Sequence, residues 1–475
     1  MTESKSRRDF LKYGAAAVGG IAVGAIGYAA LAGQPAPPAV TTTVTQTAGA
    51  TVTAPTATAA LEPVTVMWEE GGTPATILDA YVKATGYPVK IIPVGFDVMN
   101  AKIVEDMIAP EPTYDVVQVV GSNISRIVEK GDYLLPLEDR LPSDVKQNVD
   151  WDIPSLYYLD PREGKKHLYG ISAEQSYQIG YYNSEMFDEA GIDHYPVNYD
   201  EVVEFAPKLT KKDQQRYGIC LDFADDNMEL QWKQGYCAYD QYMYDKNTGE
   251  PVFNNDAGRT ITNYFRELWS KKAMNPESVN IDSSGTKIQI YANGKAAFIW
   301  SWSPLGYAMA ENPDSSQIVG KTKFGLPPGG PLKKVSTQPT INAYGVVKKS
   351  KRIDQAMHFI NWMSASDASL KAYMGEKAGQ EKSFGLLPNK RVYDLYADRP
   401  YMSTHKAAEA AWMSAPKFDT YFYRPWTGEL IDIMSRVLKK GVTGDMAVDK
   451  ALDQTVAELK EVMKTYGWPE KTFNP

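Results

Sequence analysis

The chain has 475 residues, a formal net charge of −8 and a sequence pI of about 5.3. This acidic balance argues against a nucleic-acid partner, because proteins that bind nucleic acids neutralise phosphates with Lys and Arg. Roughly 400 residues follow a segment, residues 13–61, that carries no charge. This is too many for one ordinary hydrophobic core, so the length predicts two lobes.

The N-terminus has the features of an export signal. Residues 6–12 read S-R-R-D-F-L-K, which matches the twin-arginine export consensus, and an uncharged run rich in Ala and Gly extends from Tyr13 to Ala32. We interpret residues 1–33 as a twin-arginine signal. Roughly 20 apolar residues also span a bilayer, so the sequence leaves open whether the segment is cleaved after Ala32 or kept as a membrane anchor. No cysteine lies directly after this apolar run, which excludes a lipoprotein anchor.

Residues 34–61 are rich in Thr and Pro and carry no charge. Such a composition cannot bury a core, so we predict a flexible stalk, and the sequence does not decide whether it is glycosylated. A stalk is useful only if its other end is held, which favours a chain tethered to the outer face of the cytoplasmic membrane over one released to the periplasm or medium.

Strands and helices alternate after the stalk, and this alternation predicts an α/β fold with a parallel sheet. Ligands of such sheets bind beyond the carboxyl ends of the strands. Glu70 and Asn123 follow the first and third predicted strands, so we predict that both contact a ligand. The predicted strands are 63–68, 89–94 and 116–120, and the predicted helices are 73–85, 97–108 and one that ends at Gly131.

The stretch from Tyr169 to Gly191 has the pattern of a crossover between two lobes. We predict two short strands, 169–172 and 179–182, separated by a polar centre that contains Gln175, followed by a helix capped by Ser184. Gln175 would then face the cleft between the lobes. Further predicted elements are helices 198–209 and 256–271, strands 217–222 and 296–302, helices 354–363 and 366–374, and two long helices within 425–466.

The crossover closely resembles that of extracellular solute-binding proteins of the sugar type, the maltose-binding-like family of ABC importers. Tyr181-Tyr182-Asn183, Met186-Phe187 and Ala190-Gly191-Ile192 occupy the family's positions, whereas Ser172 replaces its usual proline. Further stretches that resemble the family are 115–137, 291–302, 339–350, 385–390 and 447–459. The resemblance covers about residues 63–465 and implies a two-lobed periplasmic-binding-protein fold with several crossovers. It also implies a function, the capture of a solute that is delivered to ABC permease subunits.

The three crossover patterns divide the chain into lobes. We predict that the first lobe holds residues 62–173 and 344–387, and that the second holds residues 178–339 and 388–475. The protein is expected to be a monomer with no cofactor. We also expect no metal site, because its four histidines have no close Cys or His partner in the sequence. Cys220 and Cys237 form either a disulfide or two separate thiols.

Aromatic residues are abundant, with 30 Tyr and 10 Trp. Such residues either stack on sugar rings or pack hydrophobic cores, and composition alone does not decide between the two. Trp300 and Trp302 share one strand face by the period of two, and the resemblance implies that a Trp at this place lies in the sugar cleft, Trp302 first. Trp426 precedes the penultimate helix, where the family often places an aromatic against the sugar. The complete set of predicted ligand-binding residues is Glu70, Asn123, Gln175, Trp232, Trp302, Asn342, Tyr344 and Trp426.

The leading interpretation is a binding protein for a mono- or oligosaccharide in a cleft that closes on its ligand. One alternative is the same fold binding another solute, such as a ferric ion through clustered tyrosines, a polyamine through acidic residues, or a different organic molecule. A second alternative is a glycoside hydrolase that uses Glu69 and Glu70. Adjacent residues of a strand point to opposite faces, so these carboxylates do not pair, and we predict that the protein is not an enzyme.

Overall fold

The computed structural model describes residues 61–470 except 71, 225, 282–283, 332–333, 338, 382–384 and 415–423. The chain divides into two compact units, Met1–Ala60 and Leu61–Pro475, and all the structure below belongs to the second. The predicted export signal and nearly all of the predicted stalk lie outside the described residues. None of the described helices is both long and apolar enough to cross a bilayer.

The first lobe is built on the predicted parallel strands. β1 (Val64–Glu69) lies between β2 (Val89–Val94) and β3 (Val116–Val120), and β10 (Pro339–Val346) adds an antiparallel strand beside β3. The alternation of strand and helix is confirmed, and the first helix ends where expected, at Gly86 with φ 73°. The helices of this lobe are α2 (Thr73–Thr85), α3 (Phe96–Ile108), α4 (Gly121–Lys130), α5 (Ser143–Asn148), α12 (Ile353–Ala365), α13 (Asp367–Met374) and α14 (Val392–Leu395).

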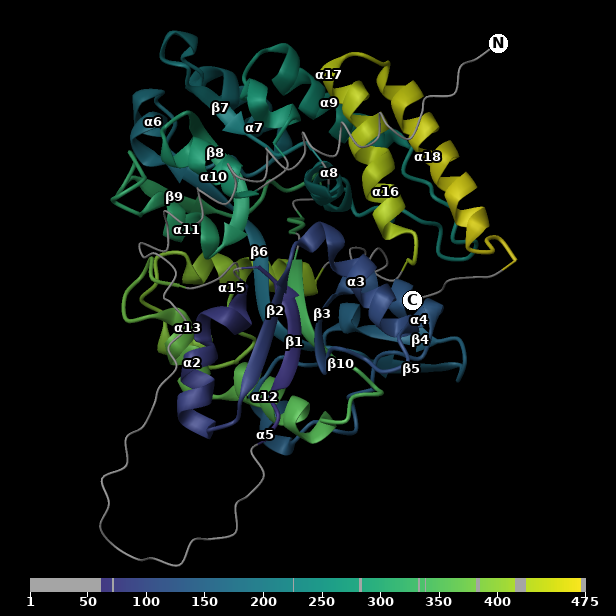
Figure 1. Ribbon diagram of the computed structural model, residues 1–475. Coiled ribbons are helices and arrows are strands. Elements are labelled where there is room, and N and C mark those ends of the chain that lie inside the picture. The colour runs from purple at the N-terminus through teal and green to yellow at the C-terminus, as the bar shows by residue number, and fades with distance from the viewer. Residues whose placement is uncertain are drawn as a thin grey trace, which may run out of the picture. The chain divides into compact units, whose positions relative to one another are not determined.

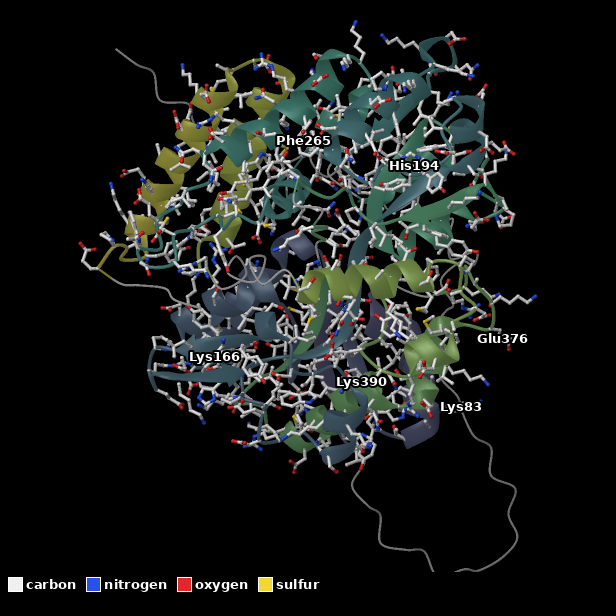
Figure 2. The ribbon with its side chains drawn as sticks, turned by 180° about the vertical axis from the view of Figure 1, so that it is seen from behind. Lys83, Lys166, His194, Phe265, Glu376 and Lys390 are labelled. Carbon is white, nitrogen blue, oxygen red and sulfur yellow. The ribbon has the colours of Figure 1, made fainter. Side chains whose placement is uncertain are left out.

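The second lobe contains β7 (Tyr217–Cys220) parallel to β8 (Ala296–Ser303), with β9 (Thr322–Gly325). Ile261, Phe265 and Leu268 of α9 are buried as predicted, and Figure 2 shows Phe265 inside this lobe. A π-helical turn, Met434–Leu438, joins two of the C-terminal helices. The helices of this lobe are α6 (Ser184–Glu189), α7 (Tyr199–Leu209), α8 (Asp226–Ala238), α9 (Asp256–Ser270), α10 (Ser284–Ala292), α11 (Leu305–Ala310), α16 (Thr427–Ile433), α17 (Lys439–Thr443) and α18 (Val448–Thr465).

One strand, β6 (Ile171–Asn183), belongs to both lobes (Figure 1). Residues 171–177 pair with β10, and residues 177–182 pair with β8. The sheet therefore follows one hydrogen-bonded path, β2-β1-β3-β10-β6-β8-β7. The prediction of two short strands around a polar kink is wrong, because Glu174 and Ser176 are buried within the ladder and bond to Asn342 and to the carbonyl of Ser303.

Asn183, rather than Ser184, caps the helix that follows β6. Its Oδ1 accepts the backbone N–H of Met186 at 3.2 Å, and α6 begins at Ser184. An Asn at this position satisfies one of the free N–H groups of the first turn as well as a Ser would.

The segment at residue 388, where the second lobe was predicted to resume, is bonded to residues of the first lobe. The Asp150 N–H donates to the Pro388 carbonyl at 2.8 Å, and the Lys390 N–H donates to the Asn148 carbonyl at 2.9 Å, so this segment is paired with the first lobe. Figure 2 shows Lys390 in the same lobe as Lys83 of α2. α15 (Met402–Met413) then packs on β6, where His405 meets the Tyr177 ring edge-on at 5.1 Å. We propose that the chain crosses to the second lobe only after α15.

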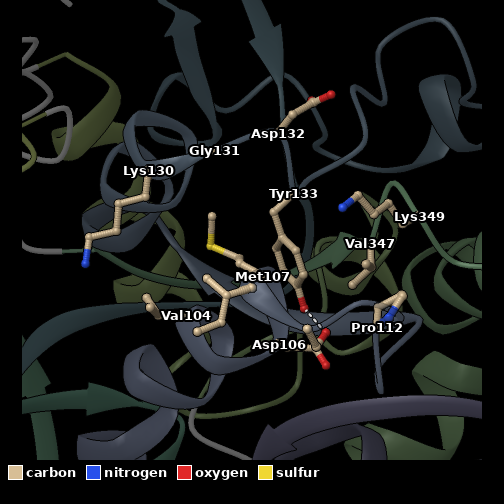
Figure 3. Close-up of a pocket in the computed structure, with 12 residues that line it drawn as sticks. Val104, Asp106, Met107, Pro112, Lys130, Gly131, Asp132, Tyr133, Val347 and Lys349 are labelled. Atoms are coloured by element: carbon tan, nitrogen blue, oxygen red, sulfur yellow. Dashed lines mark hydrogen bonds between the residues drawn. The ribbon is translucent and has the colours of Figure 1, made fainter.

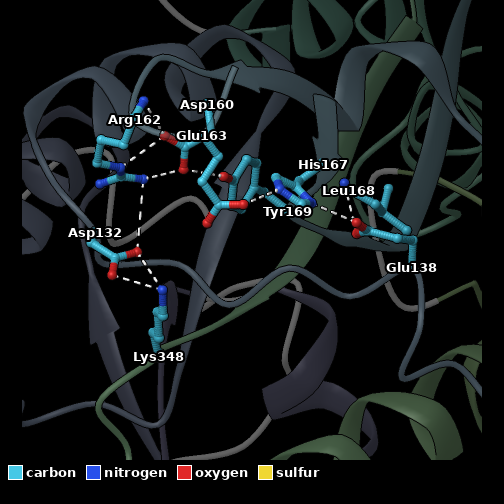
Figure 4. A network of polar contacts seen from close by, with 9 residues as sticks. All are labelled: Asp132, Glu138, Asp160, Arg162, Glu163, His167, Leu168, Tyr169 and Lys348. Carbon is cyan, nitrogen blue, oxygen red and sulfur yellow. Dashed lines mark hydrogen bonds and ion pairs between the residues drawn. The ribbon is translucent and has the colours of Figure 1, made fainter. Parts of the chain in front are cut away.

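A hairpin that the sequence did not predict, β4 (Tyr157–Asp160) and β5 (Lys165–Leu168), is held to the first lobe by ion pairs (Figure 4). Arg162 bonds to Asp160 at 2.5 Å and approaches Asp132 at 3.8 Å, while Lys348 holds Asp132 from the other side at 2.7 Å. His167 of β5 contacts Glu138 at 2.5 Å. Strands of four residues give only a weak hydrophobic pattern, which explains why the hairpin was missed.

Asp115 is the buried carboxylate that joins three segments of the first lobe. It accepts the Thr65 N–H at 2.7 Å, the Ser350 hydroxyl at 2.6 Å and the Arg352 guanidinium at 2.9 Å. We expect Asp115→Asn to lower the free energy of unfolding by about 1–3 kcal/mol, because a buried charge-assisted network loses its acceptor. Urea denaturation followed by circular dichroism measures this.

The matched control is Glu62→Gln, since exposed Glu62 holds the same Arg352 at 2.8 Å. An exposed ion pair contributes little, so this variant should unfold like the parent. Equal losses in the two variants would show that Asp115 acts only as another surface partner of Arg352.

Candidate functional site

A buried ion pair lies at the carboxyl edge of the second lobe's strands. Asp222 follows β7, and its Oδ1 is 2.8 Å from Lys287 Nζ of α10, with neither side chain exposed. Gln231 of α8 donates to Oδ1 at 2.9 Å, and Ser284 donates to Oδ2 at 3.1 Å. Parallel strands of an open sheet present their ligand site at this edge. We call these residues, together with Trp302, the Asp222 cluster.

Trp302 of β8 is joined to the cluster by its indole N–H, which donates to the Ser284 hydroxyl at 3.1 Å. Trp302 retains 7% exposure, whereas Trp300, two residues earlier, has none. Gln178 of β6 stands directly opposite Trp302 in the ladder, so the two side chains lie on one face of the sheet. The cluster thus combines an aromatic ring with carboxylate, ammonium, amide and hydroxyl groups.

Several buried polar atoms around this edge have no hydrogen-bond partner among the described residues. Both amide atoms of Gln178 and of Gln234, and Gln231 Oε1, belong to this group. Gln231 and Gln234 are three residues apart on α8 and therefore share a helix face. A buried amide without a partner costs about 1–3 kcal/mol, so such groups are suited to a ligand that carries many hydroxyls. The hydroxyls with the same property are those of Ser301, Ser303 and Ser336.

α8 carries a second buried ion pair. Glu229 and Lys233 are fully buried and 3.1 Å apart, and burial lowers the pKa of the Lys233 ammonium. Cys237 on the same helix and Cys220 of β7 are both buried and do not form a disulfide, so the structure favours two separate thiols. Burial raises the pKa of the Cys220 thiol to about 12. The Cys220 thiol is therefore not a reactive thiolate at neutral pH.

The two residues predicted at the first lobe's strand ends have different surroundings. Glu70 is exposed in the turn after β1, at the predicted edge, and remains a candidate ligand contact. Asn123 accepts the Val120 N–H at 3.0 Å and donates to Asn100 Oδ1 at 3.1 Å. Its amide is used to hold the start of α4, so its role is structural rather than that of a ligand contact.

Asn342 and Tyr344 of β10 are also part of the interior. Asn342 donates to Glu174 Oε1 at 2.7 Å. Tyr344 has no exposure, and its ring lies 4.7 Å from that of Trp68. Nearly every residue of this strand is buried, and the sequence pattern does not distinguish such a strand from one that faces a ligand.

Trp232 and Trp426 pack between helices. The Trp232 indole stacks on Tyr236 at 4.9 Å and donates to Thr262 at 2.9 Å. The Trp426 indole donates to the Tyr244 hydroxyl at 3.1 Å. Both rings are completely buried, and these contacts are those of tryptophans that pack a core.

Gln175 lines a separate cavity of about 240 Å³ between β6, the segment 386–393 and α15. Its Oε1 accepts the Tyr177 hydroxyl at 3.1 Å. His405 lines the same cavity, and burial lowers its pKa to about 3, so this imidazole is neutral. The structure therefore places Gln175 at the crossover, as predicted, but does not group it with Trp302.

A larger cavity of about 420 Å³ lies on the first lobe and contains none of the predicted residues (Figure 3). Met107 and Val104 form part of its wall, and the Tyr133 hydroxyl inside it donates to Asp106 at 2.5 Å. The cavity is near the amino end of β3, whereas ligands of open sheets bind at the carboxyl end.

Sequence reasoning missed most members of the Asp222 cluster. Asp222 was the last residue of a predicted strand, so the rule that placed Glu70 and Asn123 at strand ends could have found it. Lys287, Gln231 and Gln234 carried no comparable signal, because they lie on helices whose polar residues usually face solvent.

Comparison with known proteins gives a consistent family. The sequence model described as "Bacterial extracellular solute-binding protein" matches residues 68–369. A mannitol-binding protein of Pseudomonas aeruginosa is 23% identical over 345 residues, which cover 67% of this chain and 76% of the relative.

Solved structures share the fold. An ABC transporter solute-binding protein of Agrobacterium radiobacter K84 in complex with ribitol superposes with a TM-score of 0.70, at 19% identity over 84% of this chain and 98% of the other. A similar protein of Agrobacterium vitis S4 with bound D-mannitol gives 0.69 at 20% identity, over 86% and 99%. A maltose-bound protein of T. maritima gives 0.70 at 17% identity, over 84% and 99%.

The buried pair Asp222–Lys287 leads to a stability prediction. We expect Lys287→Met to lower the free energy of unfolding by about 3–5 kcal/mol, because it leaves a buried carboxylate without its cation. The double variant Asp222→Asn/Lys287→Met should lose less than the sum of the single variants, since the neutral Asn leaves no buried charge without its cation and its one amide oxygen still accepts from Gln231 or Ser284. Urea unfolding of the four proteins measures the coupling.

The control pair is Glu204–Lys208 of α7, which is 2.6 Å apart but about half exposed. Lys208→Met should change stability little, because exposed ion pairs are weak. Strict additivity of the Asp222 and Lys287 variants would contradict the pairing seen in the structure.

Proposed function

The chain belongs to the bacterial extracellular solute-binding proteins, and from this premise we propose that it captures a carbohydrate between its lobes and delivers it to an ABC permease. The Asp222 cluster is the observation that supports a carbohydrate. It places an indole ring beside amides, a hydroxyl and a compensated carboxylate, which together suit the CH faces and hydroxyls of a sugar or polyol. The ligands printed for the similar solved structures, ribitol, D-mannitol and maltose, support the same class.

Iron is a weaker alternative. Tyr181 is buried and donates its hydroxyl to the Trp302 carbonyl at 3.1 Å, and burial raises its pKa. Tyr182 is adjacent in the same strand and points to the opposite face, against Phe187. The two phenols do not converge on one ion, and raised pKa values oppose the tyrosinate form that ferric iron requires.

A polyamine is also less suitable than a carbohydrate. The buried carboxylates of the second lobe, Asp222 and Glu229, each already lie beside a lysine ammonium, Lys287 and Lys233. A polyamine would bring further positive charge to an edge where each of these carboxylates is already neutralised by a lysine. Other neutral organic solutes remain as outcomes of the binding test below.

We also propose that the protein catalyses no hydrolysis. Glu69 lies in β1 beside Gln118, whose amide nitrogen is 3.5 Å from its carboxylate, whereas Glu70 is exposed in the following turn. These surroundings do not bring the two carboxylates together across a substrate bond, as a glycoside hydrolase needs.

A matched pair of tryptophans tests the carbohydrate proposal. Trp302 and Trp232 each donate an indole N–H to a side-chain hydroxyl, that of Ser284 and that of Thr262 respectively. We expect Trp302→Phe to weaken binding of the best carbohydrate by about tenfold, equivalent to about 1.4 kcal/mol, because the ring and its N–H are both altered at the site. Trp232→Phe should leave the affinity unchanged.

Isothermal titration with mannitol, ribitol and maltose measures these affinities, and thermal unfolding without ligand reports the structural cost of each variant. The site is supported if both variants lose a similar amount of melting temperature and only Trp302→Phe binds the carbohydrate more weakly than the parent. Unchanged affinity in Trp302→Phe removes this tryptophan from it, and no binding of any carbohydrate by the parent chain contradicts the proposed function.

For localisation, we propose export by the twin-arginine route and tethering at the outer face of the cytoplasmic membrane, as a monomer. The family's extracellular location supports export, and residues 6–12 supply the twin-arginine sequence. We expect Arg7→Lys/Arg8→Lys to accumulate inside the cell, because this route recognises the arginine pair. Fractionation with immunoblotting measures it, and a Lys5→Arg variant is the control. Normal export of the double variant would exclude the route.

A further inference from the structure

Arg424 is a buried cation without a counter-charge in contact. Arg424 is 3% exposed, its Nε has no hydrogen-bond partner among the described residues, and no carboxylate of those residues forms an ion pair with it. The guanidinium instead lies over the rings of Tyr244 and Trp426, at 5.2 Å and 5.9 Å from their centroids. Cation–π contacts stabilise an arginine but leave its N–H donors unused.

The carboxylates of this region are engaged with other groups. Glu129 accepts the Tyr158 hydroxyl at 2.8 Å, and Glu229 pairs with Lys233 at 3.1 Å. Glu429 lies 2.8 Å from Arg126. Burial lowers the pKa of Arg424, and only the phenols of Tyr244 and Tyr158 oppose this effect. A buried guanidinium with no carboxylate beside it is unfavourable unless an anion joins it.

Arg399 is a second buried arginine of this chain, and its contacts can be compared with those of Arg424. It has 4% exposure, lies 3.5 Å from Glu381 and donates to the carbonyl of Gly375 at 3.1 Å. Arg424 has a similar burial but none of these partners, so burial alone does not explain its surroundings.

Arg424 lies where the two lobes meet. It immediately precedes α16 of the second lobe, and Tyr158, the residue whose phenol acts on it, belongs to β4 of the first lobe. Arg126 of α4 and Glu429 of α16 bridge the same two lobes at 2.8 Å. A group held between the lobes would therefore be within the region that closes on a solute.

We propose that Arg424 binds an anionic group of the solute, so that the protein captures an acidic carbohydrate, either a sugar acid or a sugar phosphate. This inference rests on the proposed carbohydrate function and adds the charge of the ligand to it. A planar guanidinium with free donors forms paired, charge-assisted bonds to the two oxygens of a carboxylate or a phosphate, which a neutral polyol cannot supply.

The first experiment uses the unmodified chain and matched ligands. Isothermal titration compares gluconate with sorbitol, and glucose 6-phosphate with glucose, with acetate and inorganic phosphate as free anions. We expect one acid to bind at least tenfold tighter than its neutral counterpart, and the pair in which this occurs identifies carboxylate or phosphate.

Equal affinities within both pairs overturn the inference but leave the proposed function intact, whereas failure of all the carbohydrates to bind overturns the proposed function itself. Free anions that bind as tightly as the acids would overturn the inference too, because the sugar would then contribute nothing.

The second experiment uses Arg424→Gln, Arg424→Lys and the control Arg399→Gln. Arg424→Gln should abolish the preference for the acid and leave the neutral ligand's affinity unchanged, while Arg424→Lys should retain part of the preference. Without ligand, Arg424→Gln should unfold at the same temperature as the parent or higher, whereas Arg399→Gln should unfold at a lower temperature with its acid preference unchanged. An Arg424→Gln protein that keeps the full preference overturns the inference, and so does one that only loses stability. If this variant does not fold, the Arg424→Lys affinities and the matched ligands on the parent chain still decide the question.

Discussion

The hydrogen-bond ladder of β6 is the constraint on which the arrangement of the second unit depends. Residues 171–177 pair with β10 in one lobe and residues 177–182 pair with β8 in the other, so one strand joins the sheets of both lobes. A slip of one residue would turn every side chain of β6 to the opposite face. The register that places Gln178 beside Trp302 therefore also places Glu174 beside Asn342 in the first lobe.

Burial of polar groups at the Asp222 edge has a cost that a simple core would avoid. Asp222 and Lys287 are fully buried, and replacing such a pair by apolar residues often leaves proteins as stable or more so. Retention of the pair is understandable if the edge must stay polar for a ligand. The proposed carbohydrate site and the buried ion pair are then two consequences of the same requirement, because hydroxyl recognition needs fixed donors and acceptors.

Aromatic residues divide between packing and the site according to their hydrogen bonds. Trp232 and Trp426 donate to Thr262 and Tyr244 within the helical part of the second lobe, which explains their complete burial. Trp302 donates to Ser284, which itself bonds to Asp222, so this ring is linked to the buried Asp222–Lys287 pair. Composition showed the abundance of aromatic residues but could not show which hydroxyl each indole would meet.

The sequence by itself determined the alternation of strands and helices, the helix end at Gly86 and the family, because each depends on local patterns or on residue order that the chain carries directly. It also located the crossover at 169–191, although not the single strand that forms it. Only the tertiary structure decided which polar residues are brought together, since Asp222, Gln231, Ser284 and Trp302 come from distant segments and meet through strand pairing and helix packing. Asn123 and Asn342 show the same limit in reverse, because an amide that caps a helix or binds a buried glutamate has the same sequence signal as one that faces a ligand.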